Sequence, residues 1–234
     1  ALFENAFEGE PANISTIGKA IASYERALIS GNSAFDKWYF AKDEDALSES
    51  AQRGFATFSG RGRCSACHLV HSDHALFTDN KMHNTGVGYG RSMRKFDPQS
   101  QPILLAPGVF IDVDPKAVSD SSEKPPGDLG LYEVTQDPSD RWKYRTPTLR
   151  NISLTGPYMH DGSLRTLRSV VDFYDRGGIE NELRDPLIQP LNLTEQEKND
   201  LVSFLDSLTG DSVERLINDA FDAPVGNRGD TPGK

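Results

Sequence analysis

The chain has 234 residues, a formal net charge of −10 at pH 7 and 36% hydrophobic residues. This length and composition predict one large domain, or a small domain with extensions, that has a modest core and many polar loops. No apolar run approaches the roughly 20 residues of a membrane-spanning helix. The negative charge argues against nucleic acid and anionic membranes as partners.

Two helices are expected before the cysteines of the chain. Apolar residues at helical spacing predict the first helix, which Asn13 or Ser15 can cap and Gly31 can end. Its stripe consists of Ile14, Ile17, Ile21, Tyr24 and Leu28. The second helix is expected over 48–58, with Gly60 as its stop, so that it leads directly into the cysteine segment.

Both cysteines lie in a Cys-x-x-Cys-His motif, Cys64-Ser65-Ala66-Cys67-His68. Two thiols at this spacing can add to the two vinyl groups of one porphyrin, and the histidine then reaches the iron from the same side. A structural zinc site would need more ligands than one cysteine pair offers, and a thioredoxin-like motif would leave His68 without a role. The motif therefore predicts one covalent haem c, attached at Cys64 and Cys67, with His68 as the proximal iron ligand.

Helical order returns near the C-terminus after a long irregular segment. Residues 84–148 are rich in Gly, Pro, Asp and Ser, and a loop of this length is usually functional or wraps something large. A helix is expected after Thr166, with Gly177-Gly178 closing it. The run from Thr194 to Glu197 has the pattern of a capping box ahead of a further amphipathic helix. A shorter helix is expected over 212–221.

These elements predict a mainly α fold, a cytochrome c-like helical domain around one covalent haem with long irregular loops. We expect an N-terminal helix and connector over 1–45 that pack on the haem domain, the haem domain over 46–221, and a disordered tail over 222–234. Because haem is attached to such motifs outside the bacterial cytoplasm, we also expect an exported, periplasmic protein whose leader has been removed.

The second axial ligand of the iron decides what such a haem does, and local spacing leaves it open. The candidates are Met82, Met93, Met159, His71, His74, His83, His160 and Tyr174. A methionine from the irregular segment would suit a simple electron carrier. Tyr174 shares a helical stripe with Leu167 and Val171, and this periodicity alone favours a core tyrosine over an iron ligand.

Three stretches resemble the bacterial di-haem cytochrome c peroxidases and their MauG-like relatives. The most specific is 145–163, RTPTLRNISLTGPYMHDGS; the other two are 77–87, FTDNKMHNTGV, and 20–28, AIASYERAL. The likeness covers nearly the whole chain apart from 88–140 and the tail. It implies one haem domain of an oxidoreductase that uses hydrogen peroxide.

The resemblance also implies the second axial ligand. In the ordinary peroxidases a methionine stands at the position that matches Tyr174, whereas the MauG-like branch has a tyrosine there, so His68/Tyr174 ligation is implied. A phenolate is a hard anionic donor that lowers the reduction potential of the iron, and the cationic iron matches its buried charge. Such a haem suits holding an oxidising equivalent.

Further site residues follow from the same resemblance. Arg145 and Arg150 are expected to pair with haem propionates, which the planar guanidinium suits, with surface salt bridges as the equal alternative. The backbone carbonyls of Thr155 and Pro157 match positions that bind calcium in family members, where another domain supplies the remaining protein ligand. His160 is expected to face the region between two haems.

The family carries two Cys-x-x-Cys-His motifs and reacts with peroxide at the N-terminal one, whereas this chain has a single motif. We therefore expect the C-terminal haem half of a longer enzyme, with no catalytic residue assigned to this chain itself. Its partners would be an N-terminal peroxide-binding haem domain, in the same or a nicked chain, and a redox partner protein or protein substrate. The alternatives are a di-haem peroxidase with a methionine ligand and a stand-alone mono-haem electron-transfer cytochrome c.

Overall fold

The computed structural model describes residues 2–93, 102–106, 109–112 and 128–222, and the chain divides into two compact units. One unit comprises Ala1–Asn32 together with Gly210–Lys234, and the other comprises Ser33–Thr209. The first division between the units falls at 32/33, and Phe35 of the expected connector is fully buried in the core of the second unit. The expected domain boundary at 45/46 stays a prediction. The packing of the N-terminal helix on the haem domain stays a prediction. Apart from Asp222, the tail expected over 222–234 lies outside the described residues.

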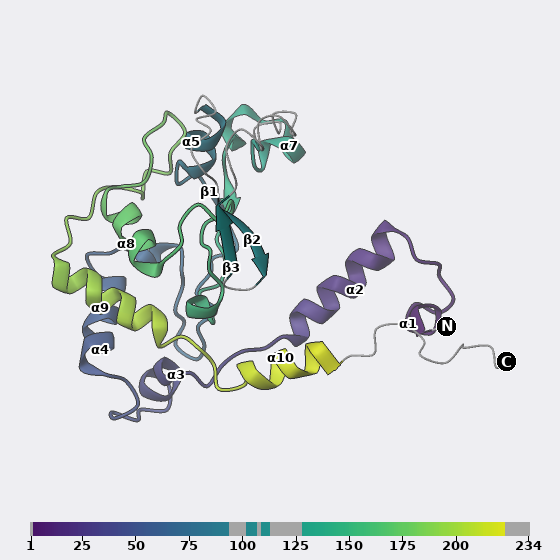
Figure 1. The fold of residues 1–234 in the computed structure, drawn as a ribbon, viewed down its shortest axis with the longest axis horizontal. Coiled ribbons are helices and arrows are strands. Elements are labelled where there is room, and N and C mark those ends of the chain that lie inside the picture. Colours follow the sequence, from purple (N-terminus) through teal and green to yellow (C-terminus); the bar gives the residue numbers. More distant parts are fainter. Residues whose placement is uncertain (1, 94–101, 107–108, 113–127, 223–234) are drawn as a thin grey trace. The chain divides into compact units, whose positions relative to one another are not determined.

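The described part of the first unit is helical, with α1 (Leu2–Ala6), α2 (Ile14–Ala27) and α10 (Val213–Asp222) (Figure 1). Asn13 begins α2 with a capping box, because its side chain accepts a hydrogen bond from the backbone N–H of Thr16 and its own N–H donates to the Thr16 hydroxyl. The helix ends at Leu28, before the expected stop at Gly31. Its apolar stripe is confirmed as one face of the helix, and that face is exposed.

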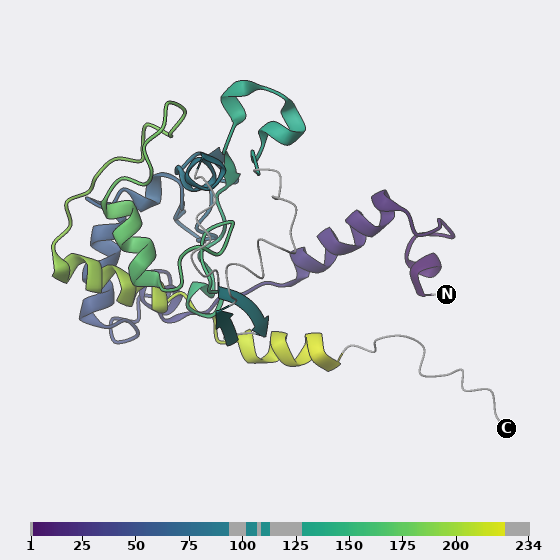
Figure 2. The same ribbon diagram turned by 45° about the horizontal axis from the view of Figure 1, so that its top comes forward.

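The second unit contains the cysteine motif and is again mainly helical. Its helices are α3 (Ala34–Tyr39), α4 (Glu49–Ser59), α5 (Val87–Met93), α7 (Tyr132–Thr135), α8 (Leu167–Asp175) and α9 (Glu195–Asp206), with 3-10 turns at Cys64–Ala66, Pro138–Asp140 and Ile152–Leu154. In both views α4, α8 and α9 lie side by side (Figures 1 and 2). Among the described residues, no helix has the length and apolar content to cross a bilayer.

The crossing of α4 and α9 is the closest helix–helix approach in this unit. Gly54 of α4 lies against the backbone of Asp200 in α9, and a Cβ at Gly54 would stand 2.0 Å from the Asp200 carbonyl oxygen. Arg53 donates two hydrogen bonds to the buried Asp200 carboxylate, at 2.9 and 3.0 Å, and Ser50 donates a third at 2.6 Å. These bonds, that of Arg53 first, hold the pKa of Asp200 at about 2 against the opposing effect of burial.

Aromatic side chains fill the core beside this crossing. Five phenylalanines contact one another with ring centroids 4.9–6.5 Å apart: Phe35, Phe55, Phe58, Phe77 and Phe204. Phe35 and Phe204 have no exposed surface. Rings at these distances contribute about 0.5–1.5 kcal/mol per pair beyond their burial. The cluster joins α3, α4 and α9 to the segment that follows the cysteine motif.

The predicted caps are confirmed in α8 and α9. Thr166 begins α8 and Thr194 begins α9, each through a capping box, and the Thr194 box closes on Glu197 as expected. Gly177 and Gly178 both have positive φ directly after α8, so the chain reverses there at little steric cost. The two threonine caps thus determine where α8 and α9 begin.

The described parts of the segment 84–148 contain more regular structure than expected, and residues 94–101, 107–108 and 113–127 lie outside the described residues. The segment contains α5 and α7, and its strand β4 (Tyr144–Arg145) pairs antiparallel with β1 (Met82–His83), with Met82 opposite Arg145 and His83 opposite Tyr144. A second antiparallel pair joins β2 (Pro102–Ala106) and β3 (Val109–Asp112). Elements this short leave little periodic signal in a sequence.

Substituting Gly54 by Ala is expected to lower the free energy of unfolding by about 1–3 kcal/mol, because the added methyl group meets a helix backbone that cannot move independently. Urea unfolding followed by circular dichroism would measure the effect. Gly18 of α2 is the matched control, since nothing lies within 4 Å of a Cβ there; Gly18→Ala is expected to be neutral or stabilising by up to about 1 kcal/mol. Equal effects of the two substitutions would contradict the close crossing.

Candidate functional site

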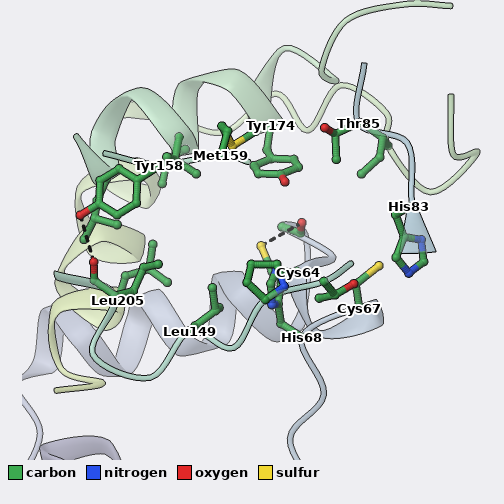
Figure 3. A pocket seen from close by; sticks show the side chains of 18 of the residues that line it. Cys64, Cys67, His68, His83, Thr85, Leu149, Tyr158, Met159, Tyr174 and Leu205 are labelled. Atoms are coloured by element: carbon green, nitrogen blue, oxygen red, sulfur yellow. Dashed lines mark hydrogen bonds between the residues drawn. The ribbon is translucent and has the colours of Figure 1, made fainter. Parts of the chain in front are cut away.

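A cavity of about 420 Å³ lies in the second unit between the cysteine motif and α8 (Figure 3). This volume is within the range of about 300–1,000 Å³ that is usual for ligand and cofactor sites. Most of its surface is apolar, and the apolar residues on its wall include Phe58, Val87, Leu149, Ile152, Leu167, Val170, Val171, Leu191, Leu201 and Leu205. Helices α4, α8 and α9 therefore all contribute to the wall.

The two cysteines of the motif stand on one side of this cavity as free thiols. A tight turn after α4 presents them: Arg63 adopts the left-handed conformation, with φ +53°, and the Cys64 thiol donates a hydrogen bond to the Gly62 carbonyl at 3.3 Å. Burial raises the pKa of Cys64 to about 12 and that of Cys67 to about 11. Both groups are therefore neutral thiols that face an apolar space.

His68 has a fixed orientation in the same wall. Its Nδ1 lies 2.7 Å from the carbonyl oxygen of Phe77, so this nitrogen carries the proton and donates, while Nε2 keeps its electron pair. Burial lowers the pKa of His68, and the ring is accordingly neutral. A neutral imidazole whose other nitrogen donates to a backbone carbonyl is the usual form of a metal-ligating histidine.

Tyr174 approaches the cavity from the opposite side. It projects from α8 with its hydroxyl directed toward Cys64 and His68 (Figure 3). In the part of the chain that the structure describes, this hydroxyl has no hydrogen-bond partner. Burial, followed by the nearby cysteines, raises its pKa well above the ordinary value. A half-buried phenol that faces an apolar cavity without such a partner points to a group that it would contact there.

Of the other candidates for the second axial position, three lie on the cavity wall and four do not. Met159, His83 and His160 line the cavity, and Met159 lies close to Tyr174 (Figure 3). Met82 and Met93 are exposed, by 39% and 62%, and are not on the cavity wall. His71 and His74 are exposed and stack on each other, 4.6 Å apart. Met159 is thus the one of the three methionines that lies on the cavity wall.

The two arginines expected at haem propionates have different surroundings. Arg145 lines the cavity. Arg150 does not: its guanidinium forms two hydrogen bonds with the Asp36 carboxylate, at 2.6 and 2.8 Å, donates a third to the Ala75 carbonyl, and lies over the Phe77 ring. The Arg150 side chain is only 10% exposed. Its donors are committed to the core, so it is not included in the site proposed below.

Thr155 and Pro157 also lie on the cavity wall. The cluster of potential metal-binding side chains found among the described residues is elsewhere, at Cys67, Asp79 and His83. Calcium binding at the two backbone carbonyls stays a prediction.

Sequence reasoning missed a polar arrangement next to Cys67. His83 contacts a carboxylate with each ring nitrogen, Nδ1 with Asp185 at 2.6 Å and Nε2 with Asp79 at 2.9 Å. We call these three residues the carboxylate clamp. The stretch that contains Asp79 and His83 was recognised, but Asp185 is more than a hundred positions away from His83, and no local pattern links them. Tyr144 and His160, also on the wall, stack with ring centroids 3.5 Å apart.

Taken together, the residues at the cavity suit a haem c. Two neutral thiols at the motif spacing, one oriented neutral imidazole beside them, an unpartnered phenol opposite and apolar walls are what a covalently attached porphyrin with two axial ligands requires. The orphaned hydroxyl of Tyr174 is the observation that a different occupant, such as an apolar ligand, would leave unexplained.

Comparisons with known proteins show what the chain is similar to. A family model described as di-haem cytochrome c peroxidase matches residues 1–45. Cytochrome-c peroxidase IdrP1 of Denitromonas iodatirespirans is 37% identical over 94% of this chain and 56% of that protein. Methylamine utilization protein MauG of Methylorubrum extorquens is 32% identical over 88% of this chain and 48% of that protein. The chain thus spans about half the length of these curated relatives.

The crystal structure of a MauG-like protein associated with microbial copper homeostasis is similar in fold as well. It is 32% identical in sequence, superposes with a TM-score of 0.57, and the match covers 87% of this chain and 59% of that chain.

Removing the partner of Arg150 is expected to destabilise the second unit without altering the cavity wall. Asp36→Ala leaves a buried guanidinium unpaired, and we expect a loss of about 3–5 kcal/mol in the free energy of unfolding. Thermal or urea unfolding would measure it. Asp45→Ala, an exposed control nearby, should change the same quantity by no more than about 0.5 kcal/mol. A loss at Asp36 as small as that at Asp45 would show that the pair does not hold the core.

Proposed function

We infer, since the chain belongs to the di-haem cytochrome c peroxidase/MauG family, that its second unit binds one covalent haem c and serves as the electron-transfer or oxidant-holding domain of an enzyme that uses hydrogen peroxide. The relatives are oxidoreductases by name, which supports an enzymatic role for the whole protein. The observation that carries the proposal is the position of the Tyr174 hydroxyl across the cavity from His68.

A haem bound here would supply one-electron chemistry at its iron. The residues of this chain attach and orient it: Cys64 and Cys67 form the thioethers, His68 offers Nε2 from one face, and Tyr174 offers its oxygen from the other. The apolar walls exclude water from both faces. Because a tyrosinate donor favours oxidised over reduced iron, these residues suit a haem of low potential that retains an oxidising equivalent.

The proton of Tyr174 is part of this proposal. Burial holds the phenol in its protonated form while the cavity contains no cation. Ligation of a ferric iron by Tyr174 would therefore require the loss of this proton, and the positive charge of the iron would compensate the negative oxygen. The His68 ring loses no proton in the process, since its N–H stays on Nδ1 at the Phe77 carbonyl.

The remaining elements of the proposal concern the whole protein. An N-terminal peroxide-binding haem domain would react with the oxidant, and a redox partner protein or protein substrate would exchange electrons with the pair. Calcium held partly by the carbonyls of Thr155 and Pro157 would lie near the junction of the two domains. The protein would act in the periplasm, where haem c is assembled and where members of the family are typically located.

Replacing Tyr174 by Phe tests the axial assignment. The variant should keep the covalent haem but change the spin state of the ferric absorption spectrum, and its reduction potential should rise because the anionic donor is gone. Met159→Leu is the matched control, as Met159 lines the same part of the cavity, and it should leave the spectrum unchanged. The assignment would be wrong if Tyr174→Phe retained the parent spectrum, or if the parent showed a sulfur-to-iron charge-transfer band that Met159→Leu removed.

The response of the absorption spectrum to hydrogen peroxide distinguishes an enzyme from an electron carrier. Adding hydrogen peroxide to the full-length gene product is expected to oxidise the haem held by His68 beyond the ferric state, visible as a change in its absorption spectrum. Subsequent addition of an electron donor should restore the ferric spectrum. A product that cycles only between ferric and ferrous states, with no response to peroxide, would be a carrier cytochrome, contrary to the proposal.

A further inference from the structure

Every polar side-chain atom of the carboxylate clamp forms a hydrogen bond. One oxygen of each carboxylate accepts from His83, and the other accepts from a backbone N–H at 2.9 Å, that of Lys81 for Asp79 and that of Leu187 for Asp185. The side chains of Asp79, His83 and Asp185 are exposed by only 6%, 15% and 18%. The clamp is therefore a rigid, fully hydrogen-bonded group.

The same geometry determines its charge. An ionised carboxylate only accepts hydrogen bonds, so a ring that faces one carboxylate with each nitrogen must donate from both and is an imidazolium. The pKa shifts agree: burial opposes the charge on His83, but Asp185 and Asp79 outweigh it and raise the pKa of His83. Burial likewise opposes ionisation of Asp79, whose hydrogen bonds nevertheless hold its pKa at about 2. Two carboxylates and one imidazolium carry one net negative charge.

The clamp stands directly beside the attachment point of the proposed haem. One ligand atom each of Cys67, Asp79 and His83 lies within 4.8 Å of the others, and His83 is next to Cys67 on the cavity wall (Figure 3). At this separation the charges of the clamp act directly on the position of the Cys67 sulfur. The group is thus electrically coupled to the position where the porphyrin would be bonded.

We propose that the carboxylate clamp of Asp79, His83 and Asp185 is a positioning element that holds one net negative charge against the Cys67 side of the haem and so favours the oxidised iron. The inference rests on the proposed haem site. Coulomb energies are largest where solvent is excluded; the three side chains of the clamp are at most 18% exposed, and His83 lies on the wall of the apolar cavity. The effect of the clamp on the iron adds to that of Tyr174, but it acts through space rather than through a bond.

Substitutions that change the net charge of the clamp in opposite directions distinguish an electrostatic role of the clamp from a purely structural one. His83→Gln removes the positive charge and makes the group more negative, so the midpoint potential of the haem should fall. Replacing both carboxylates, Asp79→Asn with Asp185→Asn, removes the negative charge, so the potential should rise. Loosening of the wall by either variant would move both potentials in the same direction.

The test is spectroelectrochemical titration of the full chain with its haem, at about pH 6, where the ordinary pKa of histidine keeps His83 protonated and the carboxylates are ionised. Glu49→Gln is the charge control, because the Glu49 side chain is 95% exposed; it should leave the potential within measurement error of the parent. The inference would be overturned if both clamp variants shifted the potential in one direction, or by no more than Glu49→Gln.

Two further measurements keep the outcomes separate. Haem staining after denaturing electrophoresis shows whether the parent protein holds a covalent haem at all, and its absence would refute the proposed function rather than the clamp. Should the double variant not fold, Asp185→Asn alone, titrated at about pH 5 so that His83 keeps its proton, should still raise the potential. No rise in a folded, haem-loaded Asp185→Asn protein would refute the inference.

Discussion

The crossing of α4 and α9 at Gly54 is the contact on which the site depends. Helices pack at 8–10 Å unless a glycine allows the backbones to approach more closely, and here the Asp200 carbonyl occupies the space that any side chain at position 54 would need. Because α4 runs directly into the cysteine motif and α9 packs against α8, this one contact sets how far Cys64 and His68 stand from Tyr174. The separation of the two proposed axial ligands is therefore set by the packing of two helices that carry neither of them.

Polar groups around the cavity are tied to the backbone to an unusual degree. His68 donates to the Phe77 carbonyl, and each carboxylate of the clamp accepts from a backbone N–H. Side chains anchored in this way lose little further entropy when a cofactor is bound. Tyr174 alone, among the axial candidates that face each other, has no such anchor in the described residues, which is why its oxygen is available to the cavity.

Much of the fold was accessible from the sequence, because the signals were local. The expected helix starts near residues 48, 166 and 194 agree with the starts of α4, α8 and α9, and the cysteine spacing indicates the proposed attachment site. What could not be predicted is long-range. The stripe that contains Tyr174 indicates a buried face, but periodicity does not distinguish a packed core from the wall of a cavity. For Arg150 the sequence leaves a haem propionate and a salt bridge as equal alternatives, because nothing local pairs it with Asp36. The clamp unites residues that only the tertiary fold brings together.

The hydrogen bond from His68 to Phe77 has an evolutionary consequence. Its acceptor is part of the main chain, so no side-chain substitution at position 77 removes it and no change of pH titrates it. Substitutions at position 77 therefore change neither the tautomer nor the orientation of the His68 imidazole. Under the proposed ligation, substitution of residue 174 alone exchanges the donor atom on the opposite side of the cavity, while the side that carries His68 stays the same.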